Sequence, residues 1–141
     1  MRRLTFLVAV LVCTCGRRPP TPPVEVRDAW ARPADSASVT AVYLVMLNHE
    51  QLPVKLSSAS SPVAESVTLH ETMEMGGMVH MMPLDSAQTI AAGDSLVLRE
   101  GAKHLMVTGL RRKLTAGDSL PLELHLSNGR VLQVRAAVRA P

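Results

Sequence analysis

The C-terminal part of the chain alternates apolar and polar residues in two runs that a turn dipeptide separates. Residues 122–126 read LELHL and residues 132–138 read LQVRAAV. A period of two places successive side chains on opposite faces of an extended strand, which indicates a strand with one buried face. Asn128-Gly129 lies between the runs. Asn-Gly is the strongest short hairpin signal, because both central residues of a two-residue turn need positive φ. We therefore predict an antiparallel hairpin over residues 122–138.

Shorter apolar and β-branched runs precede this hairpin, and no segment keeps a helical period of 3.6 residues with caps. We expect strands at residues 39–47, 54–56, 66–70, 96–99 and 105–110. Two nearly identical segments, Ala92–Leu96 and Ala116–Leu120, are expected to be turns that feed strands. Many short strands separated by Gly, Pro, Asp and Asn predict an all-β fold, an antiparallel β-sandwich or Greek-key barrel.

The N-terminal residues have a different character from the rest of the chain. Residues 1–15 have the pattern of an export segment, in which a short basic region precedes an apolar run at residues 4–12. That run is shorter than the roughly 20 residues of a membrane-spanning helix. Cys15 ends the segment and is the predicted point of lipid attachment, with simple signal cleavage left open. Residues 16–23 are Pro-rich and predict a tether, and residues 24–141 form the expected domain outside the cytoplasm, in the periplasm or lipid-anchored to the membrane.

Composition excludes several classes of function. The net charge is only +3, and one Trp, one Tyr and one Phe leave no basic stripe with interleaved aromatic residues, so nucleic-acid binding is not expected. The sequence contains no phosphate loop, nucleophile elbow or zinc-protease helix motif, so we do not expect an enzyme. The two cysteines both lie in the first fifteen residues. The domain therefore lacks the thiolate that a blue-copper electron carrier requires.

Soft metal donors are concentrated in one part of the chain. Six of the seven methionines after Met1 and three of the five histidines lie there: His70, Met73, Met75, Met78, His80, Met81, Met82, His104 and Met106. A single methionine more often fills a gap in a hydrophobic core than binds metal. The convergence of thioethers and imidazoles in a segment without thiols favours a soft ion, and Cu(I) is the ion that both donor types suit. Neutral donors also leave the charge of the ion uncompensated, which favours Cu(I) over Cu(II).

The sharpest local element in this region is His104-Leu105-Met106. Residues two apart on a strand share a face. His104 and Met106 can therefore converge on one ion while Leu105 and Val107 point into the core.

The spacing of these donors resembles the hallmark of the periplasmic copper chaperone family called PCuAC. That hallmark is a histidine, ten residues, a methionine, about twenty-one residues, and then His-x-Met. Here ten residues separate His70 from Met81, and twenty-two separate Met81 from His104-x-Met106. Further segments resemble family counterparts, and the resemblance spans Val24 to Val138: Asp28–Pro33, Ala41–Leu44, His70–Thr72, Met82–Leu84, His104–Leu110 and Leu114–Leu126.

The resemblance implies a cupredoxin-like β-sandwich that binds one Cu(I) through His70, Met81, His104 and Met106. It also implies a role in supplying copper to the CuA centre of cytochrome c oxidase, or in broader periplasmic copper handling. Met82 is the alternative to Met81, because choosing Met82 restores twenty-one residues before His104. We prefer Met81, since the ten-residue spacer is expected to lie in the same loop as both ligands.

The remaining donors and functions stay as alternatives. Met73, Met75, Met78 and His80 are expected to form a secondary site or a surface that meets a partner, with no more than one of them touching the primary ion. His49 is expected in a turn, and His125 is expected to face solvent. Alternative functions are periplasmic copper storage or resistance, and a ligand-binding or adhesion sandwich that binds no metal.

Overall fold

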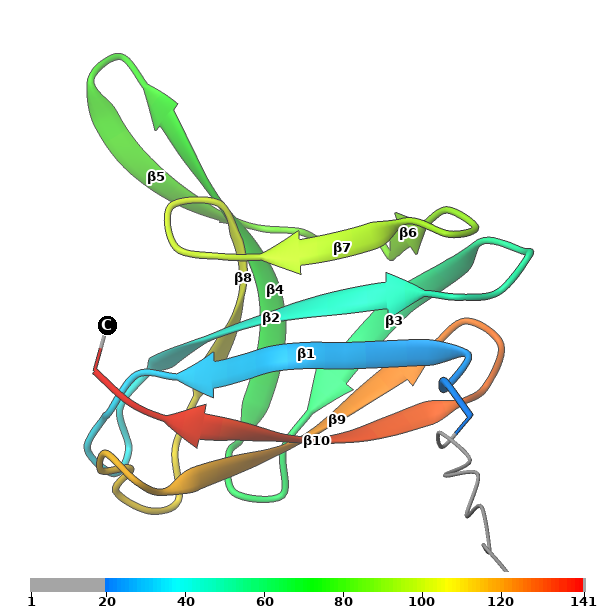
Figure 1. Cartoon of the computed structure of the whole chain (residues 1–141). Coiled ribbons are helices and arrows are strands. Elements are labelled where there is room, and N and C mark those ends of the chain that lie inside the picture. Colours follow the sequence, from blue (N-terminus) through cyan, green and yellow to red (C-terminus); the bar gives the residue numbers. More distant parts are fainter. Residues whose placement is uncertain (1–19, 141) are drawn as a thin grey trace, which may run out of the picture.

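A computed structural model describes residues 20–140, and within them the fold is all-β (Figure 1). The strands are β1 (Val24–Ala31), β2 (Thr40–Asn48), β3 (Val54–Ser60), β4 (Ser66–Met75), β5 (Met78–Pro83), β6 (Gln88–Ile90), β7 (Ser95–Leu98), β8 (Lys103–Thr108), β9 (Ser119–Leu126) and β10 (Val131–Val138). The predicted all-β class is confirmed. Strands β1, β5 and β6 were not expected from the sequence, and β4 runs five residues past its predicted end.

The strands form a barrel in the order β4-β8-β2-β1-β10-β9-β3, which a β3–β4 pairing closes. Strand β7 pairs with β2 beside β8, and β5 and β6 extend the sheet at β4 and β3. The expectation of antiparallel pairing is wrong for β1 and β10, which run parallel. These two strands come from opposite ends of the domain, so no turn between them imposes an antiparallel direction.

The core is aliphatic and is built from alternate positions of the strands. On β9, Leu120, Leu122 and Leu124 are fully buried, while the residues between them are half-exposed. Leu105 and Val107 of β8 are also buried, as predicted. The period of two read from the sequence therefore identifies the core face of these strands correctly.

The predicted hairpin at the C-terminus is present, but its turn differs from the expected one. Only Gly129 has positive φ (82°), and Asn128 does not. The N–H of Gly129 donates to the carbonyl of Leu126 (3.0 Å), and the N–H of Leu126 donates to the carbonyl of Arg130 (2.8 Å). The loop thus has three residues with glycine in the left-handed position, the next most common hairpin connection after the two-residue turn.

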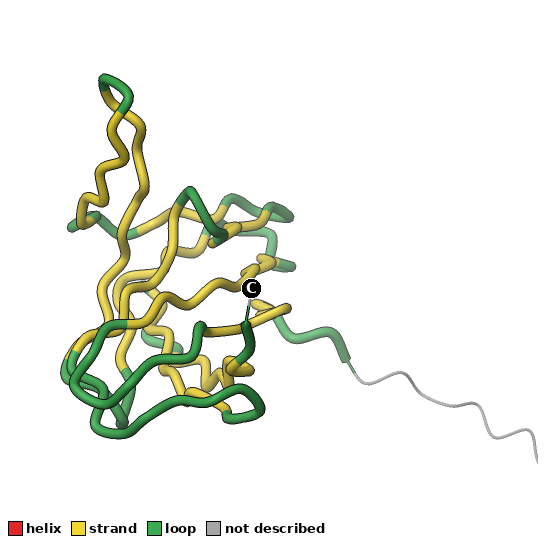
Figure 2. Tube along the Cα trace, turned by 90° about the vertical axis from the view of Figure 1, so that its left-hand side faces the viewer, coloured by secondary structure: helices red, strands yellow, loops and turns green. Residues whose placement is uncertain are grey.

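The β4–β5 hairpin projects from one end of the barrel (Figures 1 and 2). Gly76 and Gly77 both have positive φ (62° and 78°), and Met75 pairs directly with Met78 across the turn. This is the two-residue turn that matches the twist of the flanking strands. The expectation that His70 and Met81 lie in a loop is therefore wrong, because both lie on paired strands.

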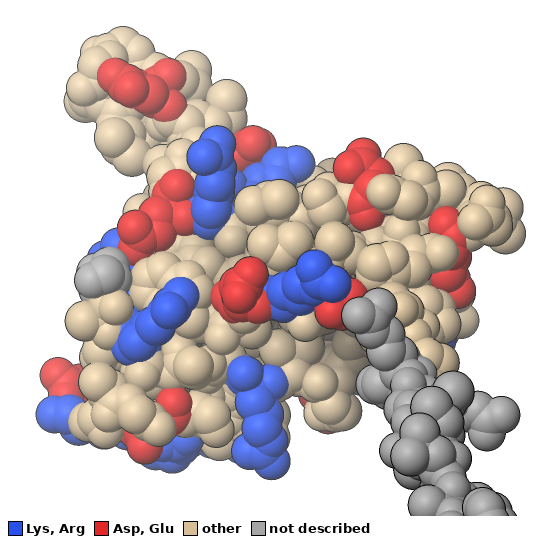
Figure 3. Space-filling view, viewed as in Figure 1, with Lys and Arg blue, Asp and Glu red and all other residues tan. Residues whose placement is uncertain are grey.

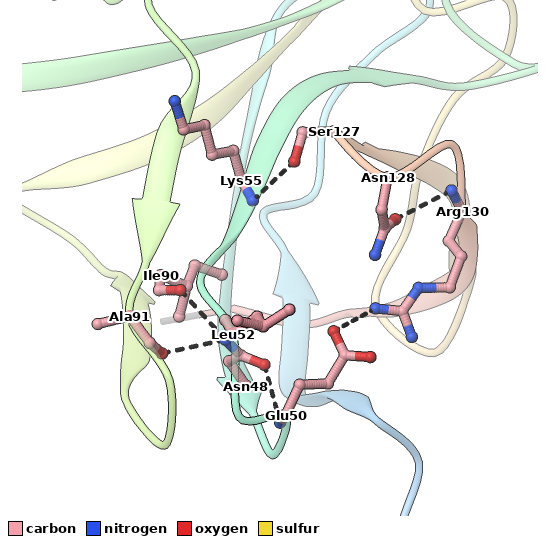
Figure 4. Close-up of polar contacts among 9 residues, drawn as sticks. All are labelled: Asn48, Glu50, Leu52, Lys55, Ile90, Ala91, Ser127, Asn128 and Arg130. Carbon is pink, nitrogen blue, oxygen red and sulfur yellow. Dashed lines mark hydrogen bonds and ion pairs between the residues drawn. The ribbon is translucent and has the colours of Figure 1, made fainter.

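Asn48 organises the end of the barrel away from the hairpin (Figure 4). Its side chain is buried, and its Nδ2 atom donates to the carbonyls of Leu52 (2.9 Å), Ile90 (3.2 Å) and Ala91 (3.0 Å). Its Oδ1 atom accepts from the N–H of Glu50 (3.0 Å). One buried amide thus ties backbone groups of two loops to the end of β2.

The predicted export segment, Cys15 and the first part of the tether lie outside the described residues. Residues 20–23 are exposed and without regular structure, and β1 begins at Val24. Across residues 20–140, the structure contains no helix of the length and hydrophobicity needed to cross a bilayer. The division into export segment, tether and domain stays a prediction.

Candidate metal-binding face

The register between β4 and β8 determines which side chains share a face. His70 lies opposite His104, and Thr68 lies opposite Met106. Leu69 lies opposite Leu105, and this pair belongs to the core face. Because side chains alternate along both strands, His70, His104 and Met106 all lie on the face away from the core.

The register between β4 and β5 distinguishes the two candidate methionines. Met81 lies opposite Thr72, and Met82 lies opposite Glu71. Thr72 is two residues from His70, so Met81 shares the face of the histidines. Met82 points to the other side of the hairpin. Both methionine side chains are about half exposed, so burial does not indicate which of them is the better candidate ligand. The strand register does, and it favours Met81.

His104 is the most enclosed of the predicted ligands. It is 4% exposed, and its Nδ1 atom lies 3.0 Å from the carbonyl oxygen of Ala102. A carbonyl only accepts hydrogen bonds, so Nδ1 carries the proton and Nε2 of the neutral ring keeps its lone pair. A backbone carbonyl that orients an imidazole in this way is typical of metal-binding histidines.

His70 lies beside His104 and is more exposed. The two ring centroids are 6.1 Å apart, and the ring planes make an angle of 21°. The Nδ1 atom of His70 is 3.3 Å from Oγ1 of Thr68. The two imidazoles are therefore neighbours across the β4–β8 pair.

A cavity of about 450 Å³ lies on this face at the base of the hairpin. Met81, His104 and Met106 line it together with Tyr43 and Thr72. His70 is not part of its lining, but its ring lies next to that of His104. The structure therefore brings three of the four predicted residues to one cavity and places the fourth next to one of them.

An aromatic row leads from the cavity across the sheet. The rings of Tyr43 and His104 are 6.3 Å apart, and those of Trp30 and Tyr43 are 4.7 Å apart. A β-bulge at Asp28, which has φ of 52°, shifts the register of β1 so that Trp30 pairs with Tyr43. Trp30 and Tyr43 both lie in segments that resemble the family, but nothing in the sequence indicated that their rings would form a row with His104.

One ion pair lies at the rim of the cavity. The Arg32 guanidinium donates to the Glu100 carboxylate, and this hydrogen bond raises the pKa of Arg32 above its ordinary value. Both side chains line the cavity and are nearly half exposed. Their charges cancel, so the rim adds no net charge to a face of neutral donors.

The other histidines lie away from this cavity. His49 is in the β2–β3 turn, as predicted, with Nε2 3.0 Å from the Glu25 carboxylate. Hydrogen bonds from Arg27 and then His49 lower the pKa of Glu25. His125 is partly exposed on β9, with Nε2 3.1 Å from Oγ of Ser60. Within residues 20–140, no three His, Cys, Asp or Glu side chains gather in a metal-binding arrangement.

Comparison with known proteins agrees with the fold. The copper-bound PCuAC domain from PmoF2 superposes with a TM-score of 0.68 over 86% of this chain and 97% of that domain, at 17% identity. The solution structure of CuI-DR1885 from Deinococcus radiodurans is 33% identical, covering 79% of this chain and 76% of that protein, with a TM-score of 0.60. "Putative lipoprotein Lxx21020" from Leifsonia xyli is 33% identical over 116 residues, which is 82% of this chain and 69% of that protein.

The barrel fold defines a domain of the PCuAC type, which confirms the predicted fold and the resemblance. The family model described as "Putative lipoprotein LpqE-like" matches residues 24–138. The chain belongs to this LpqE-like family.

Proposed function

We propose that this protein is an extracytoplasmic copper chaperone that binds one Cu(I) ion in its primary site. The ligands in this proposal are His70, Met81, His104 and Met106. The ion is cargo, and the protein is a carrier and not an enzyme. The recipient that we propose is the CuA centre of cytochrome c oxidase.

The observation that carries the proposal is the strand register. The register places the candidate ligands of three strands, β4, β5 and β8, on one face of the sheet. The copper-bound PCuAC domain and CuI-DR1885 share this fold and add support from their own bound metal.

The chemistry of the donors suits a carrier of Cu(I). Thioethers and imidazoles are neutral and soft, and they select Cu(I) over hard ions. His104 provides an Nε2 lone pair on a ring that Ala102 already orients, so this end of the site is preorganised. Met81 lies on an exposed hairpin, where an incoming partner ligand could replace its thioether before the others.

Anaerobic Cu(I) titration of the full chain against a competing chelator tests the ligand set, with X-ray absorption reporting sulfur and nitrogen ligation. We expect His104→Ala and Met106→Leu to remove most of the affinity of the tightest site. His125→Ala changes a histidine at a partly exposed strand position, and Met46→Leu changes a methionine in the core. These two matched controls should leave that affinity unchanged. Circular dichroism verifies that each variant is folded. Full affinity in both ligand variants would contradict the assignment.

Transfer is tested by mixing the Cu(I)-loaded protein with the metal-free CuA domain of the oxidase and separating the two proteins. We expect copper to move to the CuA domain in wild type, and more slowly in His70→Ala. Copper that stays with the loaded protein under every condition would favour storage over delivery.

We also propose that Cys15, outside the described residues, carries a lipid that anchors the protein to the membrane. The LpqE-like family and the relative from Leifsonia xyli both carry the description of a lipoprotein, which supports this proposal. Intact mass of the protein extracted from membranes, compared with Cys15→Ala, tests it. A membrane fraction that survives in Cys15→Ala would argue against this anchor.

A further inference from the structure

The β4–β5 hairpin carries a second set of soft donors on the face that the proposed copper site does not use. In β4, Met73 and Met75 alternate with Thr72 and Glu74 and therefore lie opposite to the face of His70. In β5, the residues of this second face are Met78, His80 and Met82. We call these five residues the back-face cluster.

The register brings the members of the back-face cluster close together. Met73 lies directly opposite His80, and Met75 lies directly opposite Met78. Side chains directly opposite each other on antiparallel strands have Cβ atoms about 4.5–5.5 Å apart. Met78 and Met82 flank His80 on its own strand. Flexible thioethers on three sides of one imidazole can converge on an ion bound to its ring.

Packing does not explain this cluster. All five side chains are exposed, with Met78 exposed to 64% and Met75 to 56%. The hairpin stands clear of the barrel, so no core lies beneath these methionines (Figure 2). The usual role of methionine as a filler of core gaps therefore does not apply here.

The donors around the cluster also favour a soft ion of low charge. Of the two carboxylates on the hairpin strands, Glu74 lies on the other face, and Glu71 lies on the back face at the base of the hairpin, directly opposite Met82. In the view of Figure 3 the hairpin is mostly uncharged, with one acidic group near its tip. Hard divalent cations require several oxygen ligands, whereas Glu71 is the one carboxylate on this face of the hairpin and the five residues of the back-face cluster are sulfur and nitrogen donors.

We propose that the back-face cluster is a second binding site for a soft monovalent ion, Cu(I) or Ag(I), with His80 and Met73 at its centre and Met78 and Met82 beside them. It shares no ligand with the site of His104 and Met106. Since successive side chains of a strand point to opposite faces, one ion cannot serve both sets. The second site is open to solvent and binds more weakly than the first.

Titration of the full chain with Ag(I), a redox-silent probe, tests the proposal when the methionine methyl groups carry ¹³C and are followed by NMR. We expect the methyl signals of Met81 and Met106 to shift with the first equivalent. Those of Met73, Met78 and Met82 should shift with a second, while the buried Met46 serves as an internal reference. Native mass spectrometry should count two ions.

The paired variant Met73→Leu/His80→Ala should lose the second ion and keep the first. Glu74→Gln is the matched control, because it changes an exposed hairpin residue on the other face, and it should keep both ions. Back-face signals that never shift, or that shift together with Met81 in the first equivalent, would overturn the proposal. Back-face shifts with Met81 and Met106 unmoved would support this site and contradict the proposed copper ligands.

Discussion

His70 and His104 lie directly opposite each other on β4 and β8, with ring centroids 6.1 Å apart. The His104 ring is buried, and its Nδ1 atom donates to a backbone carbonyl. The His70 ring is more exposed, and its hydrogen-bond partner is the hydroxyl of Thr68. The two imidazoles are therefore unequal. In the proposed copper site, His104 would provide a nitrogen that is already oriented, and His70 would provide a nitrogen that is free to adjust.

The two neighbouring methionines of β5 should differ sharply in their effect on copper binding. Met81 shares the face of His70 and His104, and Met82 does not. Loss of an outer-shell partner typically weakens metal binding roughly 10–100-fold. We expect Met81→Leu to weaken the tightest Cu(I) site by at least that much and Met82→Leu to leave it nearly unchanged, as measured by chelator competition. The reverse ranking would mean that the β4–β5 register is shifted by one residue when copper binds.

The turn of the hairpin should influence copper binding from a distance. Gly77 has φ of 78°, and an L-residue in the left-handed region costs about 1–2 kcal/mol. We expect Gly77→Ala to fray the hairpin, to increase amide hydrogen exchange in β5 and to weaken Cu(I) binding through Met81. The melting temperature should change little, because the tip can open without opening the barrel. Gly76→Asn is the control, since asparagine suits the first position of this turn, and it should behave as wild type.

Asn48 should contribute to stability and not to metal binding. Its buried amide donates to three carbonyls at the end of the barrel away from His104. Leaving buried polar groups without partners costs about 1–3 kcal/mol. We expect Asn48→Ala to lower the free energy of unfolding in urea by about this amount while Cu(I) affinity stays unchanged. Asn128→Ala, at an exposed turn, should cost less, and an equal loss in both variants would contradict the role of burial.

Asp118 should make stability depend on pH below neutrality. Hydrogen bonds from the backbone N–H and then the hydroxyl of Thr115 lower the pKa of Asp118 in the folded protein. A lowered folded pKa gives stability that is present above the ordinary carboxyl pKa of about 3.9 and is lost as the pH falls through the folded value. Asp118→Asn should therefore melt earlier than wild type at pH 7, and the difference should shrink in acid. Asp94→Asn, in the matching turn, is the control variant in the same thermal scans.

The parts of the fold that depend on local periodicity were predictable from the sequence. The hairpin over residues 122–138 and the common face of His104 and Met106 both follow from a period of two. The segment 24–31 does not show this period, because a bulge at Asp28 interrupts it and charged residues surround the bulge. The Gly76-Gly77 dipeptide was an available signal for the β4–β5 hairpin, although methionine and glutamate around it are not typical of strands.

The parts that depend on pairing between distant strands were not predictable from one sequence. A slip of one residue between β4 and β8 would turn His70 to the core face and Leu69 to the outside. Only the burial of Leu69, Leu105 and Val107 against the rest of the core selects the observed register. The parallel pairing of β1 with β10 is likewise a product of barrel closure.

Trp30 is the single tryptophan of this chain, and its indole contacts Tyr43, which in turn contacts His104. The guanidinium of Arg139 covers the same indole at 5.0 Å. Excitation of the unlabelled protein at a wavelength that tyrosine does not absorb thus addresses one chromophore two rings away from the proposed cargo. Its emission is a built-in optical readout, able to follow the arrival and departure of metal in real time.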